Sequence, residues 1–150
     1  PIDSHSTDLI SANIQVLLEY LSRFYDRQFL TRHNVNSSVV DAFEKELTDI
    51  YSSGKTLDEV PKVSYFAEKA NLTPGYFGDL IKRETGNTPQ EIITLRLIAE
   101  AKRRLTATDN DISVIAYDLG FQYPQHFTRL FKRITGKSPS IFRNEFLSNN

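Results

Sequence analysis

The sequence has no cysteine, no methionine and no tryptophan among its 150 residues. Without cysteine, a disulfide framework and a thiolate metal site are both excluded. No run of about 18 apolar residues occurs, so we expect no membrane-spanning helix. The polar start, residues 1–5, does not have the apolar core of a signal peptide. These absences fit a cytoplasmic location, and the lack of an initial methionine suggests a part of a longer protein.

Signatures of common enzymes are also missing from the sequence. It contains no HExxH motif, no Gly-rich phosphate loop and no GxSxG motif. Its three histidines, His5, His33 and His126, lie far apart in the sequence and give little support to a metal site. We therefore expect neither an enzyme nor a bound cofactor or metal.

Charge is small overall but unevenly distributed. The net charge of −1 is low for a nucleic-acid-binding protein, which is usually basic. Residues 1–57 carry five Lys/Arg against eight Asp/Glu, whereas residues 58–150 carry thirteen against eleven. From Leu119 onward there are five basic residues and one acid. The positive charge is therefore concentrated toward the C-terminal end.

Apolar residues recur at spacings of three and four, which predicts an all-α fold. A first helix is expected over about residues 8–32, with a heptad a/d seam made of Ile10, Ile14, Leu17, Leu21 and Phe24. Residues 34–38 form a polar break. A second helix is expected over about residues 39–52, capped by Ser37 or Ser38 and ended by Gly54.

Two interpretations of this region remain open. The two helices could pack on each other as an antiparallel hairpin. Alternatively, residues 8–32 could form a coiled coil with a second copy, which would make the protein a homodimer.

An internal repeat follows. Residues 74–89 (PGYFGDLIKRETGNTP) and residues 124–139 (PQHFTRLFKRITGKSP) share eight of sixteen positions at an offset of 50. A repeat at a fixed offset indicates one supersecondary unit used twice.

Each copy has the capping and turn residues that are typical of a helix-turn-helix unit. In the second copy, Asp111 is a plausible N-cap, Gly120 suits a turn with positive φ, and Pro124 opens the next helix. In the first copy Asn71 takes the turn position, since Asn tolerates the left-handed region better than other non-Gly residues. Phe121 is expected to enter the core, as are residues on the inner faces of the two following helices: Phe77, Leu80, Phe127, Leu130 and Phe131.

The two units are connected by one long helix. Thr88 and Glu91 form a predicted capping box with Pro89 at the first helical position. A helix of about 18 residues from there is roughly 27 Å long. Successive major-groove faces of B-DNA are about 34 Å apart, so such a spacer suits two reading helices in adjacent grooves.

At these residues the chain resembles the AraC/XylS family of bacterial transcription regulators. The second copy carries the resemblance through Ile112, Ile115, Ala116, Leu119, Gly120, Phe121, Phe127, Arg129, Phe131, Lys132, Gly136, Pro139 and Arg143. The first copy and the connecting helix carry it through Ala67, Phe77, Leu80, Lys82, Thr85, Gly86, Ala101 and Leu105.

The resemblance implies two helix-turn-helix subdomains joined by a long central helix, which bind double-stranded DNA sequence-specifically in transcription regulation. Residues 1–57 would be a helical hairpin or linker for dimerisation, the tail of an upstream domain. Residues 58–150 would be the DNA-binding domain, divided into 58–88, 89–106 and 107–150. An effector ligand would be bound by the upstream domain, and RNA polymerase is a further expected partner. The alternative is a helical protein–protein adaptor that retains the fold with weak DNA binding.

The resemblance also places the candidate contact residues on helices 74–85 and 124–135. Gln125, His126, Thr128 and Arg129 are candidates for reading base edges, because Arg pairs with guanine and Gln with adenine. In the first unit Tyr76 and Asp79 take matching places beside two glycines, which departs from the polar or basic side chains usual in the family. Five basic residues are candidates for phosphate contacts: Lys82, Arg83, Lys132, Arg133 and Lys137.

Overall fold

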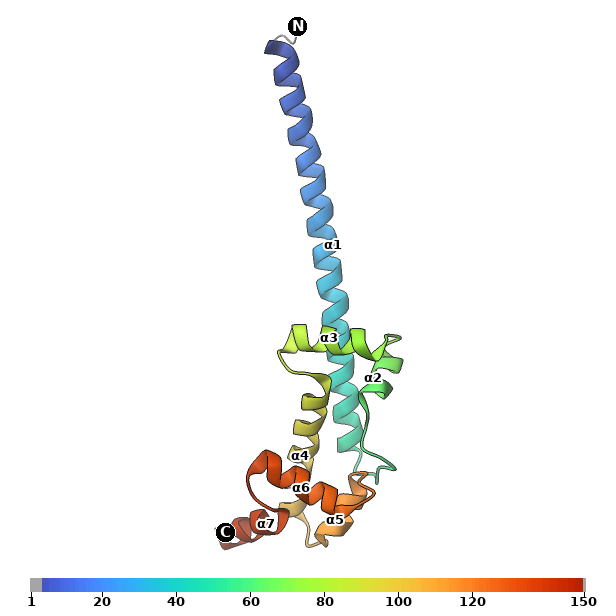
Figure 1. Ribbon diagram of the computed structural model, residues 1–150, viewed down its shortest axis with the longest axis vertical. Helices are drawn as coiled ribbons and strands as arrows, with labels where there is room; N and C mark the ends of the chain where they lie inside the picture. Colours follow the sequence, from blue (N-terminus) through green and yellow to red (C-terminus); the bar gives the residue numbers. More distant parts are fainter. Residues whose placement is uncertain (1–3, 150) are drawn as a thin grey trace. The chain divides into compact units, whose positions relative to one another are not determined.

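The computed structural model describes residues 4–149, which fold into seven α-helices without a strand (Figure 1). The helices are α1 (Ser4–Ser52), α2 (Val63–Lys69), α3 (Pro74–Thr85), α4 (Pro89–Ala107), α5 (Ile112–Asp118), α6 (Pro124–Thr135) and α7 (Pro139–Ser148). The chain divides after Val39 into two compact units, so that α1 contributes to both.

The predicted helix break at residues 34–38 is wrong, and with it the antiparallel hairpin. α1 runs through this segment as one helix of 49 residues. Asn and Ser are weak helix formers, but no Pro or Gly lies between Pro1 and Gly54 to break the helix. Within this segment the Ser38 hydroxyl donates to the carbonyl of Val35 at 2.7 Å, so its side chain bonds within the helix. Gly54, with φ of 65°, follows the end of the helix as the sequence predicted.

The last three turns of α1 belong to the core of the larger compact unit, residues 40–150. Phe43, Leu47 and Tyr51 are at most 3% exposed. The Phe43 ring packs edge-on against Phe66 of α2 and Phe77 of α3, with centroids 4.9 and 5.4 Å apart. The structural division therefore falls after residue 39 and not after residue 57, because these aromatic contacts join the end of α1 to the first helix-turn-helix unit.

The first helix-turn-helix unit consists of α2 and α3. Asn71 takes the turn position with φ of 55°, as predicted, and the N–H of Leu72 donates to the Ala67 carbonyl at 2.9 Å. Thr73 caps α3 by accepting a hydrogen bond from the Tyr76 N–H, and Pro74 occupies the first turn. The turn thus forms without glycine, at the cost of a non-glycine residue in the left-handed region.

The second helix-turn-helix unit consists of α5 and α6, and its turn has the same hydrogen-bond pattern. Gly120 has φ of 89°, and the N–H of Phe121 donates to the Ala116 carbonyl at 3.0 Å. Asp111 stands at the N-cap of α5, but its side chain makes no capping hydrogen bond. Phe121 is only half-buried, although its ring lies 5.4 Å from that of Phe127.

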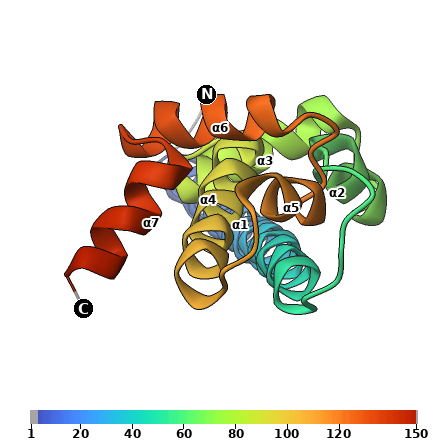
Figure 2. The ribbon, with the colours of Figure 1, turned by 90° about the horizontal axis from the view of Figure 1, so that it is seen from below.

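α4 connects the two units. Its predicted capping box is present: the Thr88 hydroxyl accepts from the Glu91 N–H, and the Glu91 carboxylate accepts from the Thr88 N–H at 2.7 Å. The helix has 19 residues, which makes it roughly 28 Å long. α3 and α6 lie toward its two ends and on the same side of it (Figures 1 and 2). One face of the domain therefore presents both candidate reading helices.

Candidate nucleic-acid interface

α6 is divided sharply between an apolar and a polar side. Phe127 and Phe131 are fully buried, as predicted, whereas Leu130 is only half-buried. Gln125, His126 and Arg129 are exposed on the other side, and Thr128 is half-buried. The buried rings hold the helix in place, so the exposed polar side chains project from a fixed backbone.

The first turn of α6 has an exposed aromatic side chain that the sequence did not single out. Tyr123 stands at the N-cap position and is 49% exposed. Its ring meets the ring of His126 edge-on, with centroids 5.4 Å apart. The contact restricts the orientation of His126, one of the predicted base-reading side chains.

α3 buries the equivalent positions but presents different side chains. Phe77, Leu80 and Ile81 are at most 2% exposed, whereas Tyr76 and Asp79 face solvent. Gly75 and Gly78 lie beside them, and a Cβ added to either glycine would meet no atom within 4 Å. The two predicted reading helices therefore bury side chains at equivalent positions but expose different side chains to solvent.

The predicted phosphate contacts lie at the C-terminal ends of both helices. Lys82 and Arg83 are exposed in the last turn of α3, and Lys132 and Arg133 are exposed in the last turn of α6. Lys137, just after α6, forms an ion pair with Glu145 of α7. A phosphate would have to compete with this carboxylate for Lys137.

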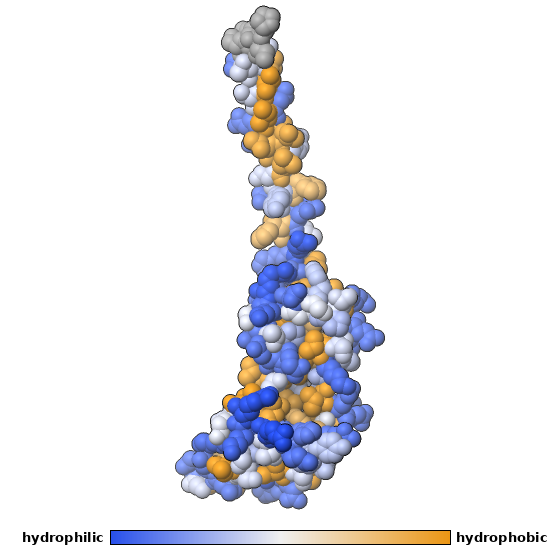
Figure 3. All heavy atoms as spheres, in the orientation of Figure 1, coloured by the Kyte–Doolittle hydropathy of each residue, from blue (hydrophilic) through white to orange (hydrophobic). Residues whose placement is uncertain are grey.

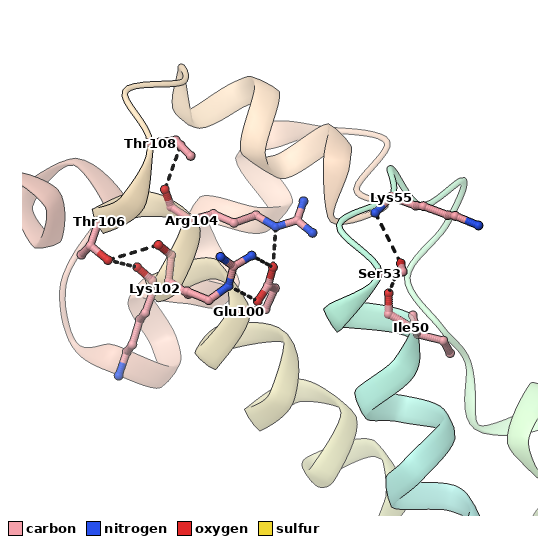
Figure 4. A network of polar contacts seen from close by, with 9 residues as sticks. Ile50, Ser53, Lys55, Glu100, Lys102, Arg104, Thr106 and Thr108 are labelled. Carbon is pink, nitrogen blue, oxygen red and sulfur yellow. Dashed lines mark hydrogen bonds and ion pairs between the residues drawn. The ribbon is translucent and has the colours of Figure 1, made fainter.

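The buried Glu100 of α4 is the centre of an ion cluster (Figure 4). Glu100 accepts hydrogen bonds from Arg103 at 2.7 and 2.8 Å and from Arg104 at 2.7 Å. Burial by itself raises the pKa of Glu100, but the hydrogen bonds from the two guanidinium groups outweigh it and hold the pKa below its usual value. The spacing of three and four residues could have revealed this cluster in the sequence.

One further contact was invisible to sequence reasoning because its partners lie far apart in the chain. Arg143 of α7 donates from Nε to the Leu105 carbonyl near the end of α4, at 3.0 Å. The hydroxyl of Tyr51, on α1, is also buried, and this burial raises its pKa. Both side chains serve the packing around α4 rather than the outer surface.

The arrangement is that of a double helix-turn-helix protein, and the comparisons with known proteins agree. The model of a helix-turn-helix domain family matches residues 66–145. The chain belongs to the AraC family of helix-turn-helix transcription regulators and contains the domain through which this family binds DNA. This is a family of regulators and not of enzymes.

Similar curated proteins are bacterial regulators. The HTH-type transcriptional regulator YobQ of Bacillus subtilis is 35% identical over 57% of this chain and 36% of its own length. The raffinose operon regulatory protein RafR of Pediococcus pentosaceus is 31% identical over 65% of this chain and 33% of its own. The transcriptional activator RhaS of Yersinia pestis is 38% identical over 43% of this chain and 24% of its own. The chain thus spans about a third or less of these relatives.

Solved structures share the fold. The C-terminal domain of the response regulator AraT from Geobacillus stearothermophilus aligns with a TM-score of 0.60 and 22% identity, over 74% of this chain and 84% of its own. The DNA-binding domain of AdpA, solved in complex with a target DNA, aligns with a TM-score of 0.59 and 23% identity, over 69% of this chain and 95% of its own.

Within the described residues 4–149, the structure contains no helix with the length and hydrophobicity that a membrane span requires.

Proposed function

We propose that the domain binds duplex DNA sequence-specifically, with α3 and α6 in two adjacent major grooves. The observation that carries the proposal is the exposed polar side of α6, held by the buried Phe127 and Phe131. Gln125, Thr128 and Arg129 have the donors and acceptors that base edges in a major groove require. A helix of roughly 28 Å between the units suits the spacing of about 34 Å between successive grooves.

The two units read sequence unequally in this proposal. Arg129 offers a forked donor for guanine, whereas the equivalent Asp79 can only accept a hydrogen bond and is repelled by phosphates. Gly75 and Gly78 have no side chains with which to read a base. The first unit therefore contributes mainly phosphate contacts from Lys82 and Arg83, with Tyr76 as its one long side chain near the bases.

Selection of binding sites from random duplexes tests this function, followed by measurement of affinity against salt concentration. About four to six phosphate contacts give a slope of roughly −4 to −5 in log K against log salt. Tight binding of a peptide partner, with no duplex binding even at low salt, would instead establish the protein as an adaptor.

We also propose that residues 8–32, which lie in unit 1, make the protein a homodimer. Thirteen large hydrophobic side chains from Leu9 to Val35 are more than half exposed in the described part of this unit. Figure 3 shows hydrophobic residues gathered along the upper part of the helix, with hydrophilic residues between them further down. The five residues of the predicted seam are among them, at 52–63% exposure. A large exposed apolar surface of this kind is typical of a protein–protein interface.

Sedimentation at high protein concentration tests the homodimer. The double variant Leu17→Asp with Leu21→Asp places charges in the seam and should sediment as a monomer. Gln15→Asp with Ser22→Asp adds the same charges outside the seam and should sediment like the wild type. Monomers in all three samples would contradict the proposed dimer.

The remaining expectations concern the whole regulator. Binding of an effector by an upstream domain and contact with RNA polymerase stay predictions. We propose a cytoplasmic location because the family acts on DNA, and an activating role because the relative RhaS is a transcriptional activator.

A further inference from the structure

The two helix-turn-helix units are connected along the chain through α4, but a second segment contacts both of them. We name residues 40–60 the strut. At its first end, Phe43 packs on Phe66 and Phe77 of the first unit. Glu46 accepts hydrogen bonds from the Tyr65 hydroxyl at 2.7 Å and from Lys69 at 2.6 Å. These contacts attach the strut to both α2 and α3.

The other end of the strut is attached to the turn of the second unit. The Thr56 hydroxyl donates to Oδ1 of Asp118 at 2.9 Å, and the Leu57 N–H donates to the Asp118 carbonyl at 3.0 Å. The strut then passes directly over Gly120. A Cβ at that position would lie 2.4 Å from the carbonyl carbon of Glu59 and 2.6 Å from the nitrogen of Val60. The backbone of the strut therefore fills the space that a side chain of residue 120 would need.

We propose that the strut fixes the position of α6 relative to α3, and thereby sets the spacing between the two groups of base pairs that the protein recognises. The inference rests on the proposed function. Two bodies joined at one place can rotate about the joint, whereas a second attachment removes this freedom. In this proposal Thr56, Asp118 and Gly120 are positioning residues, which act on DNA through the placement of α6.

A purely stabilising strut would behave differently. Its loss would lower the fraction of folded protein, and the apparent affinity for every duplex would fall by the same factor. Loss of a spacing device instead changes the ratio between affinities for two duplexes. That ratio is independent of the folded fraction and is the quantity to measure.

The experiment uses the full chain and two duplexes. The first carries the site obtained by selection, and the second has one additional base pair between its two halves, which moves one half by about 3.4 Å and about a tenth of a turn. The main variant is Gly120→Ala. Its matched control is Gly136→Ala, because Gly136 has a similar φ of 81° but no atom within 4 Å of an added Cβ. A second variant, Thr56→Ala with Leu57→Pro, removes both hydrogen bonds to Asp118 without changing the turn.

We expect the wild type and Gly136→Ala to prefer the first duplex by about ten-fold or more, because the longer site displaces one reading helix from its base contacts. In Gly120→Ala and in the second variant the preference should fall to within about three-fold. An unchanged preference in the second variant, with circular dichroism like that of the wild type, would overturn the inference and leave the proposed function intact. Failure of the wild type to bind any duplex would overturn both.

Discussion

Truncation of Phe43 tests whether the end of α1 is a structural part of the DNA-binding domain. The side chain is 3% exposed and packs edge-on against two other buried rings. Replacing a buried phenylalanine with alanine removes its transfer free energy and leaves a cavity, at a cost of about 3–5 kcal/mol. For a unit of 111 residues, 40–150, this corresponds to a fall in Tm on the order of 10–20 °C.

The assay is urea denaturation followed by circular dichroism, at a protein concentration too low for self-association. Phe24→Ala is the matched control, since Phe24 lies on the same helix but is 63% exposed. Its unfolding free energy should change by no more than about 0.5 kcal/mol. If Phe43→Ala costs no more than Phe24→Ala, the end of α1 is not part of the core and a chain beginning near residue 58 would be stable.

Four other substitutions test the interface and the ion cluster. Arg129→Ala should cost about 1–3 kcal/mol on the selected site and relax the preference at one or two base pairs, measured on a panel of single-base-pair substitutions, whereas Lys132→Ala should weaken all duplexes about equally. Asp79→Ala should leave the preferred sequence intact and tighten binding by removing a repulsion; a scrambled preference here, with none in Arg129→Ala, would show that the reading roles are reversed. Glu100→Gln should lower the free energy of unfolding by about 1–3 kcal/mol at pH 7. Because the pKa of Glu100 is lowered on folding, its stabilisation is complete above about pH 4.3 and is lost as the pH falls through the lowered value. The loss of stability on acidification should therefore be smaller in Glu100→Gln, and an unchanged pH dependence would contradict the role of the cluster.

The sequence by itself determined the repeated unit and most helix ends in residues 58–150. The capping box of Thr88 and Glu91, the left-handed Asn71 and the positive φ of Gly120 all follow from chemistry within a few residues. Such short-range signals act in the same way in any fold. The outward side of α6 could also be predicted, because its period of burial is set by the helix itself.

The course of α1 was decided by weaker local preferences and by packing. Residues 34–38 have poor helix propensity, and the sequence therefore predicted a break. Propensity differences of a few tenths of a kcal/mol per residue are small beside the burial of Phe43, Leu47 and Tyr51 a few residues later. Which partners those three residues meet depends on α2, α3 and α4, which lie well downstream in the sequence.

Only the tertiary structure decided how the second helix-turn-helix unit is held. Thr56 and Asp118 are 62 residues apart, and Arg143 donates to the carbonyl of a residue 38 positions earlier. Neither pair has a local signature, because a hydrogen bond between distant residues requires only that the fold bring a donor to an acceptor. Gly120 was expected from its turn alone, but the approach of the Glu59 backbone adds a second reason for glycine that only the folded chain contains.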